Sequence, residues 1–301
     1  MGQPSATRLY LVLACGVIAV SLAAIFIRLA DAPGVVVAAY RMVIASLALL
    51  PWTLRALRRT PLTRENVGYT LLAGILLGAH FATWITSLSY TTVAVSVALV
   101  TTNPLWIALL SWMFLGFAPS FTGLMGVIIA VLGGALIGFG DLSGGSAPLL
   151  GDALALLGAI FVSAYLLLGR AAQRRGLSLQ AYIGAAYSVA ALLLLPLPLL
   201  LDLPYTGYSV QTLFWIALLA LVPQLIGHTS FNYVVKHLDP TLVATVTLLE
   251  PIGSGLLALL LFSEIPSLFT LLGGLILLAG VGLTARNSRA APEPSQVASD
   301  P

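Results

Sequence analysis

Long apolar segments separated by short polar connections are the main pattern along the chain. A helix of about 20 residues rises about 30 Å, the hydrocarbon thickness of a bilayer. Lipid offers the backbone no hydrogen bonds, and the period-2 alternation of transmembrane strands is absent, so these segments are predicted to be membrane-spanning helices. The ten predicted spans are residues 9–29, 34–54, 67–88, 94–115, 121–140, 152–170, 181–201, 211–234, 241–262 and 267–285.

The second half of the sequence repeats the first. At an offset of 147 residues Asn103 aligns with Glu250, each followed by proline, and for the first helix of each half an offset of 142 aligns Ser21 with Ser163. Each unit contains five spans, and an odd number makes the second unit enter the membrane in the opposite sense. The predicted fold is an all-α integral membrane protein whose ten transmembrane helices form two inverted five-helix repeats.

The repeats are predicted over residues 8–141 and 150–286. Residues 287–301, rich in Ala, Pro, Ser and acids, are predicted to be a disordered tail.

Charged residues are sparse and unevenly placed. They make up 8% of the chain, against roughly a quarter in soluble domains. One set of predicted helix ends carries Arg8, Arg55, Arg58, Arg59, Arg64, Arg170, Arg174, Arg175, Lys236, Arg286 and Arg289, and the opposite connections carry Asp31, Asp141, Asp152, Asp202 and Glu264. The positive-inside bias predicts a plasma-membrane protein with both termini in the cytoplasm. This distribution explains the net charge of +3 without a nucleic-acid partner.

Several segments resemble the drug/metabolite transporter superfamily in its EamA-type branch. They are residues 26–28 (Phe-Ile-Arg), 39–41 (Ala-Tyr-Arg), 91–120 and 248–264, together with the five-plus-five layout. The resemblance covers nearly the whole chain up to about Arg286. In that family the fourth and ninth spans usually end in a Leu-Gly-Glu-like triplet; here Glu264 keeps the acid and Phe117 replaces it in the first repeat. The resemblance implies a secondary transporter, commonly an exporter of metabolites, amino acids or foreign compounds.

Intramembrane ionisable residues are candidate functional groups, because a charge at the centre of a helix costs roughly 2.5–3.5 kcal/mol. Glu250 lies midway along the ninth predicted span, before Pro251, whose missing N–H frees a backbone carbonyl one turn earlier. An acid beside a broken helix can bind a cation or substrate or take up a proton; alternatively, a protonated Glu250 bonds a neighbouring helix. Asn103 is its uncharged equivalent, so the predicted site is asymmetric.

Polar residues also recur on single helix faces. His80 and Trp84 are four residues apart and project from one face, as a cavity wall or as a helix-to-helix contact. Gln224, His228 and Asn232 form a polar stripe at the same spacing. The stripe either lines a polar pathway or makes interhelical hydrogen bonds worth roughly 0.6 kcal/mol each.

Two features of the first half allow more than one interpretation. Arg41 lies about 10 Å into the second span at 1.5 Å per residue. It either attracts an anionic group of a substrate or makes a structural bond to loop carbonyls or an acid. A ridge of small residues, Gly126, Ala130, Gly134 and Gly138, is interpreted as intramolecular helix packing in preference to a dimer interface.

The hypothesis from sequence is a proton-coupled or facilitative exporter of a small solute that works by alternating access in the lipid bilayer. Its predicted central cavity contains Glu250, His80, His228, Trp84, Asn103, Gln224, Asn232 and Arg41. The sequence has no phosphate-binding G-x-x-x-x-G-K-[ST] loop, so the chain alone cannot use ATP, and no cofactor or metal site is predicted. A passive channel or facilitator is the alternative. A membrane-embedded enzyme would need its polar groups near one headgroup layer, not at the midplane. Substrate identity and oligomeric state stay open.

Overall fold

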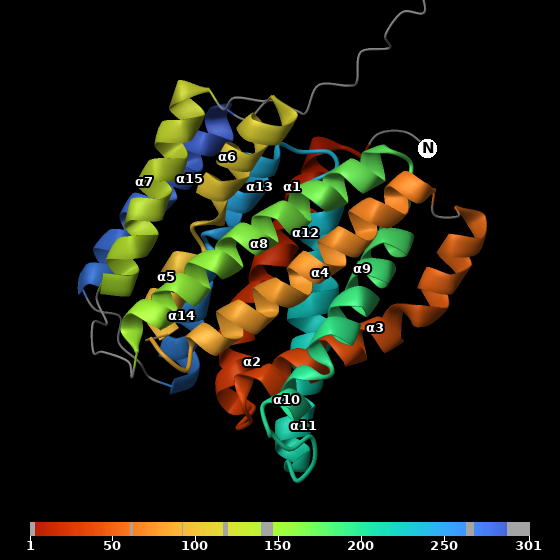
Figure 1. Cartoon of the computed structure of the whole chain (residues 1–301). Coiled ribbons are helices and arrows are strands. Elements are labelled where there is room, and N and C mark those ends of the chain that lie inside the picture. The colour runs from red at the N-terminus through yellow and green to blue at the C-terminus, as the bar shows by residue number, and fades with distance from the viewer. Residues whose placement is uncertain are drawn as a thin grey trace, which may run out of the picture.

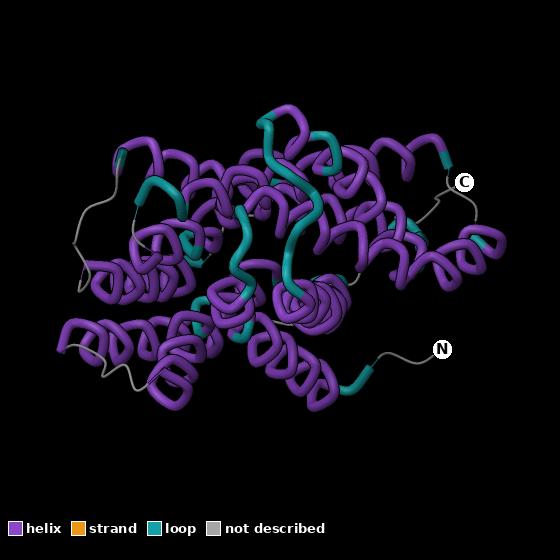
Figure 2. The backbone as a smooth tube through the Cα atoms, turned by 90° about the horizontal axis from the view of Figure 1, so that it is seen from below, coloured by secondary structure: helices purple, strands orange, loops and turns teal. Residues whose placement is uncertain are grey.

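The computed structural model describes residues 4–60, 63–91, 93–116, 120–139, 147–262 and 268–287, and all regular structure in these ranges is helical. Figure 2 shows the helices joined by loops. In chain order they are α1 (Ala6–Ser21), α2 (Ala23–Leu29), α3 (Gly34–Arg59), α4 (Arg64–Ser87), α5 (Val93–Val100), α6 (Asn103–Leu115), α7 (Phe121–Phe139), α8 (Pro148–Arg174), α9 (Leu179–Leu194), α10 (Leu197–Leu200), α11 (Val210–Leu219), the π-helix η1 (Ala220–His228), α12 (Thr229–Val234), α13 (Pro240–Thr247), α14 (Glu250–Phe262) and α15 (Leu268–Asn287).

Seven helical stretches in the described ranges are long and apolar enough to cross a membrane. They are Ala6–Leu29, Gly34–Arg59, Arg64–Ser87, Pro148–Arg174, Leu179–Leu200, Val210–Val234 and Pro240–Leu261. Three shorter apolar helices, Asn103–Phe114, Phe121–Leu136 and Leu271–Thr284, fall within the other three predicted spans. The all-helical membrane fold is therefore confirmed, while the count of ten crossings stays a prediction. Residues 288–301, Asp141 and Glu264 lie outside the described ranges, and Asn287 is the last residue of α15.

Two of the predicted spans are interrupted at equivalent positions. The fourth is broken at residues 101–102 into α5 and α6, and the ninth at residues 248–249 into α13 and α14. Pro104 and Pro251 lie in the first turn of the helix that follows, where a missing N–H leaves no hydrogen bond unmade. The break lies directly before Glu250, so this acid does lie beside a broken helix, and the proline helps to begin the next helix.

Close contacts between the halves are reciprocal, as in a two-fold arrangement. A Cβ added to Gly16 would lie 2.8 Å from the ring of Phe231, and one added to Gly158 would lie 3.1 Å from the Cβ of Trp84. Gly16 and Gly158 are equivalent in the repeat, and so are Trp84 and Phe231. A contact and its exchanged copy occur together when two units are related by a two-fold axis. The halves are therefore packed about a pseudo-two-fold axis.

Helices α7 and α15 lie side by side at one edge of the molecule (Figure 1) and approach closely at glycines. A Cβ on Gly280 would lie 2.3 Å from the nitrogen of Ala130 and 2.6 Å from the carbonyl oxygen of Gly126. The small-residue ridge of α7 therefore packs against α15 of the same chain, which agrees with the interpretation from sequence. Gly133 makes the close contact with α15 at 2.4 Å, whereas a Cβ on Gly134 would meet side chains only at 3.9 Å.

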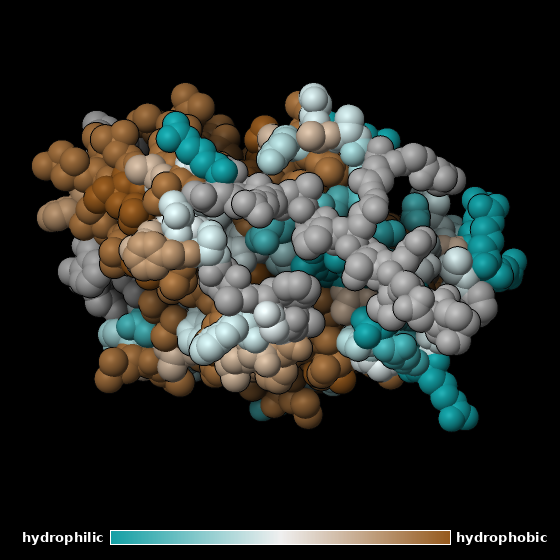
Figure 3. Space-filling model, turned by 90° about the horizontal axis from the view of Figure 1, so that it is seen from above, coloured by the Kyte–Doolittle hydropathy of each residue, from teal (hydrophilic) through white to brown (hydrophobic). Residues whose placement is uncertain are grey.

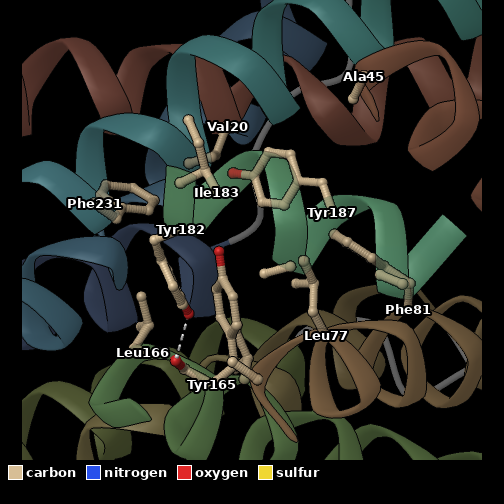
Figure 4. Packing of buried hydrophobic residues seen from close by; sticks show 14 of the residues in the cluster. Val20, Ala45, Leu77, Phe81, Tyr165, Leu166, Tyr182, Ile183, Tyr187 and Phe231 are labelled. Carbon is tan, nitrogen blue, oxygen red and sulfur yellow. Dashed lines mark hydrogen bonds between the residues drawn. The ribbon is translucent and has the colours of Figure 1, made fainter. Parts of the chain in front are cut away.

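The buried interior includes three tyrosines of α8 and α9. Tyr165, Tyr182 and Tyr187 are each 0% exposed. The Tyr182 hydroxyl donates to the carbonyl oxygen of Tyr165 at 3.2 Å (dashed in Figure 4), and the two rings stack with centroids 6.2 Å apart. These side chains fill the space between α8 and α9 and pack tightly there.

Charged side chains meet at one end of the bundle. Arg175 pairs with Glu65 at 2.7 Å, and the Nε of Arg174 donates to the carbonyl oxygen of Lys236 at 3.4 Å. The starts of α1 and α4 and the end of α8 lie at this end, at the top of Figure 1. Figure 3 views it directly and shows hydrophilic side chains in the middle and on one side of a largely hydrophobic body.

Candidate functional site

A cavity of about 70 Å³ lies between the two repeats. It is lined by Val20, Ala23, Arg41, His80, Trp84, Val100, Thr101, Asn103, Val162, Leu166, His228, Phe231, Thr247 and Glu250. Since one water occupies roughly 10–15 Å³ on this kind of measure, the space holds a few waters or part of a small solute. Six of the eight residues predicted from sequence line it: Glu250, His80, His228, Trp84, Asn103 and Arg41.

The cavity lining follows the internal repeat. Four pairs of equivalent residues line it, namely Val20 with Val162, Trp84 with Phe231, Val100 with Thr247, and Asn103 with Glu250. The cavity therefore straddles the pseudo-two-fold axis. Arg41, His80 and His228 break the symmetry, because the positions equivalent to them hold a serine, a glycine and a phenylalanine.

Equivalent serines contact the two helix breaks. The Ser163 hydroxyl donates to the carbonyl oxygen of Ala159 at 2.6 Å and lies 3.1 Å from that of Asn103. The Ser21 hydroxyl donates to the carbonyl oxygen of Val17 at 2.9 Å and lies 3.5 Å from that of Glu250. Interrupted helices are tolerated inside a membrane where neighbouring helices supply polar contacts. The serines thus fix Asn103 and Glu250, the first residues of α6 and α14, at the cavity wall.

Arg41 is almost completely buried, with 1% of its surface exposed. Its Nε donates to the Oε1 of Gln224 at 2.9 Å, and its Cζ lies 4.3 Å from the ring centroid of Phe81. Its Nη1 is buried and has no hydrogen-bond partner, and no ion pair joins Arg41 to Glu250 among the described residues. The structural partner of Arg41 is therefore an amide and an aromatic ring, neither of which neutralises its charge.

The rings of His80 and His228 both contact the ring of Phe81. The Nδ1 of His80 is 2.9 Å from the carbonyl oxygen of Gly158, and because a carbonyl only accepts, this nitrogen carries a proton. The His80 ring stacks on Trp84 with centroids 5.8 Å apart, and His228 meets Phe81 edge-on at 5.6 Å. His80 thus bonds a neighbouring helix and also lies in the cavity wall.

Unpartnered polar atoms of both kinds belong to the cavity lining. Besides Arg41, the Nε1 donor of Trp84 and the Oδ1 acceptor of Asn103 are buried without a hydrogen-bond partner. Buried polar groups are normally hydrogen-bonded, so such atoms need water or a ligand. Together with the Glu250 carboxylate they can bind a small polar solute.

Gln224 and Asn232 are not among the residues that line this cavity. Both are 0% exposed. Gln224 accepts from Arg41, and the Nδ2 of Asn232 donates to the hydroxyl of Tyr165 at 2.6 Å. The Oε1 of Gln224 and the Nδ2 of Asn232 thus make interhelical hydrogen bonds, whereas the Nε2 of Gln224 and the Oδ1 of Asn232 are buried without a partner. Only His228 of the stripe reaches the cavity.

Several lining residues were not predicted from the sequence. Phe231 is the clearest case, because it is the repeat equivalent of Trp84 at the offset of 147 and could have been found from that alone. Val20 and Val162 carry no polar signal, but they too are equivalent in the repeat.

Comparisons with known proteins identify transporters as relatives of this chain. The chain matches the EamA-like transporter family twice, over residues 7–139 and 149–286. An uncharacterized transporter, YdfC, of Bacillus subtilis (strain 168) is 28% identical over 254 residues, 82% of this chain and 80% of that protein. An uncharacterized transporter of Archaeoglobus fulgidus is 27% identical over 263 residues, 81% of this chain and 85% of that protein. A solved crystal structure with 19% identity superposes with a TM-score of 0.78 over 94% of this chain and 98% of that chain, which shows a shared fold.

Proposed function

Since this chain belongs to the EamA-like transporter family, we propose that it moves a small metabolite across the membrane by alternating access, with the central cavity as its substrate site. Transport is secondary and runs outward, from cytoplasm to exterior, when the solute is more concentrated inside. Both termini lie in the cytoplasm at the plasma membrane. The gathering of Arg8, Arg174, Arg175 and Lys236 towards one end supports that orientation.

The observation that carries this proposal is the position of the cavity on the pseudo-two-fold axis. Four equivalent pairs line it, and the interrupted fourth and ninth spans each begin a new helix at its wall, at Asn103 and Glu250. In transporters built from inverted repeats, discontinuous helices form the substrate site between the repeats. Alternating access then requires only that the two halves exchange roles in closing the two ends of the cavity.

Glu250 is proposed to carry the coupling proton. It is the carboxylate that lines the cavity, and its repeat equivalent Asn103 cannot ionise. A single titratable acid in the cavity gives the transporter one group that can take up a proton when the cavity opens to one side of the membrane. The same group can release the proton when the cavity opens to the other side. The Glu250→Gln variant keeps the shape and removes this titration.

The site is tested by filling the cavity in purified protein reconstituted into liposomes. Val162→Trp adds a large ring to a cavity of about 70 Å³, and Leu157→Trp adds the same ring at an exposed position on the same helix, α8. Counterflow is measured with a panel of radiolabelled amino acids, organic acids, sugars and organic cations. We expect Val162→Trp to abolish counterflow and Leu157→Trp to retain it, with both variants monodisperse.

Full counterflow in Val162→Trp would overturn the cavity as the substrate site. Val20→Trp, the repeat equivalent on α1, is an independent check if Val162→Trp does not fold. Flux that does not saturate, and shows no counterflow with any compound, would instead indicate a passive channel. If Glu250→Gln keeps full pH-gradient-dependent flux, the coupling role of this carboxylate is wrong.

A further inference from the structure

We propose that the transported solute is a small organic monoanion bound by Arg41, and that it crosses together with one proton carried by Glu250. The inference rests on the proposed function and names the substrate class and the stoichiometry of that same site. It makes the transport cycle electroneutral.

Arg41 is built as an anion-binding group. Its guanidinium is held from one side by the Gln224 oxygen at 2.9 Å and from another by the ring of Phe81 at 4.3 Å. These contacts use Nε and the face of the group, and they leave the buried Nη1 without a partner. A guanidinium is always charged in proteins and presents its donors in a fixed plane that matches carboxylates. A buried, oriented and unneutralised donor in a cavity wall selects an anionic group.

The charges of the cavity limit what can bind. The ionisable lining residues are Arg41 from α3, His80 from α4, His228 from η1 and Glu250 from α14, and the other lining residues, on α1, α2, α5, α6, α8, α12 and α13 and at the break after α5, are uncharged. With both histidines neutral, Arg41 and an ionised Glu250 sum to zero. A monoanion would leave one net negative charge in a desolvated space, which is costly. A proton taken up at the same time restores neutrality, so anion and proton bind cooperatively.

We place the proton on Glu250 and not on either histidine because both histidines lie near Arg41, around the ring of Phe81. The guanidinium of Arg41 and the rings of His80 and His228 all lie within 5.6 Å of the centroid of this ring. A proton on either histidine would therefore put a second cation within about 10 Å of Arg41, and like charges repel strongly across a dry space. A proton on Glu250 removes the one negative charge that repels the incoming anion.

The apolar lining residues indicate the size and polarity of the solute beyond its anionic group. Trp84 and Phe231 face the cavity from equivalent positions, with Val20 and Val162 beside the axis. The unpartnered Trp84 Nε1 offers a second donor to an anionic or carbonyl oxygen. The site therefore fits a short carboxylate or sulfonate with a compact, partly apolar body. A dianion would need a second proton acceptor, for which the lining offers only the disfavoured histidines.

The test uses the full-length protein in proteoliposomes with matched radiolabelled probes. The anions are pyruvate, lactate and benzenesulfonate, chosen because they cross lipid slowly; the neutral match is benzenesulfonamide, the zwitterion alanine and the cation choline. Flux is driven separately by a pH gradient and by a potassium–valinomycin potential. We expect one or more of the anions to be transported, with the pH gradient driving accumulation and the potential having no effect.

The variants separate the two roles. Arg41→Gln is expected to raise the KM for the anion about 10- to 100-fold, the range for loss of a hydrogen bond to a charged group. Arg28→Gln, at an exposed arginine of α2, is the control expected to leave the KM unchanged. Glu250→Gln is expected to carry the anion without a proton, so that its flux becomes driven by the potential and indifferent to the pH gradient. His228→Gln is expected to keep the pH-gradient drive.

Each failure has a distinct meaning. Transport of only neutral, zwitterionic or cationic probes, or an unchanged KM for the anion in Arg41→Gln, overturns the substrate class and leaves the proposed function intact. Loss of pH-gradient drive in His228→Gln with its retention in Glu250→Gln overturns the assignment of the proton. Absence of counterflow with every probe refutes the proposed function, and this inference with it.

Discussion

The packing of α7 against α15 gives the sharpest test of the fold. Gly280 and Gly282 are two residues apart on α15, and both have ordinary helical backbone angles. A Cβ on Gly280 would lie 2.3 Å, 2.6 Å and 2.7 Å from backbone atoms of Gly126 and Ala130, whereas a Cβ on Gly282 meets nothing within 4 Å. Gly280→Ala and Gly282→Ala therefore make the same chemical change in opposite surroundings.

The expected difference follows from these distances. In both variants alanine favours the helix by roughly 0.5–1 kcal/mol, and this gain cancels in the comparison. At Gly280 the obstructing atoms are backbone, which cannot rotate away, so the helices must move apart towards the 3.4 Å of ordinary contact. Overpacking of this kind costs about 1–3 kcal/mol. At about 2–4 °C per kcal/mol, Gly280→Ala should melt roughly 2–12 °C below Gly282→Ala.

The measurement is thermal unfolding of detergent-solubilised protein, followed by intrinsic fluorescence and by the loss of the monodisperse gel-filtration peak. Gly133→Ala, at the repeat equivalent of Gly280, should show a loss of similar size, because its Cβ would lie 2.4 Å from the nitrogen of Leu277. If Gly280→Ala melts at or above Gly282→Ala, the close approach of α7 and α15 and the intramolecular use of the ridge are refuted.

Three further changes have definite expected outcomes. Ser163→Ala removes the hydroxyl that contacts the backbone at the α5–α6 break, so it should cost about 0.5–1.5 kcal/mol and speed hydrogen exchange there, as mass spectrometry can measure. Tyr182→Phe removes a buried hydroxyl bonded to a carbonyl of α8 and should lower the melting temperature by a few degrees. The pKa of His237 lies below its ordinary value of 6.5 because of burial, then of Lys236 and Arg174. Its contribution to stability is therefore present above that value and lost as pH falls below it, and His237→Gln should lose less melting temperature between about pH 7.5 and 5.5 than wild type.

The repeat explains how much of the fold was predictable. Hydropathy located the helices because the bilayer demands about 20 apolar residues per crossing. The alignment of Ser21 with Ser163 at an offset of 142 anticipated equivalent roles, and in the structure both contact a helix break. The breaks themselves had a signal in the two Asn-Pro and Glu-Pro pairs. A proline after Asn103 or Glu250 marks a helix start, where its missing N–H is harmless, as well as an interruption.

The site was less predictable because side-chain partners lie on other helices. Gln224 and His228 are four residues apart and look alike as a polar pattern, yet one bonds Arg41 and the other reaches the cavity. Spacing along one helix shows that two residues share a face, not which neighbour that face meets. The partner of Arg41 was not found for the same reason: residue 224 is 183 positions away.

The two halves have equivalent backbone contacts, but each charged residue of the cavity occurs in one half without a charged equivalent in the other. The breaks, their serines and the glycine contacts occur in equivalent pairs, so each half can make the same movement as the other. An exchange between two equivalent closed states needs little free energy, which suits alternating access. A fully symmetric cavity, however, would have to carry its charges in pairs, and two arginines or two glutamates near one axis would repel each other across a small, dry space. With glutamate at 250 and asparagine at 103, and with arginine at 41 and serine at 188, the cavity wall has one acid and one arginine without a charged equivalent. In the proposed mechanism the two halves then exchange roles around a single polar site.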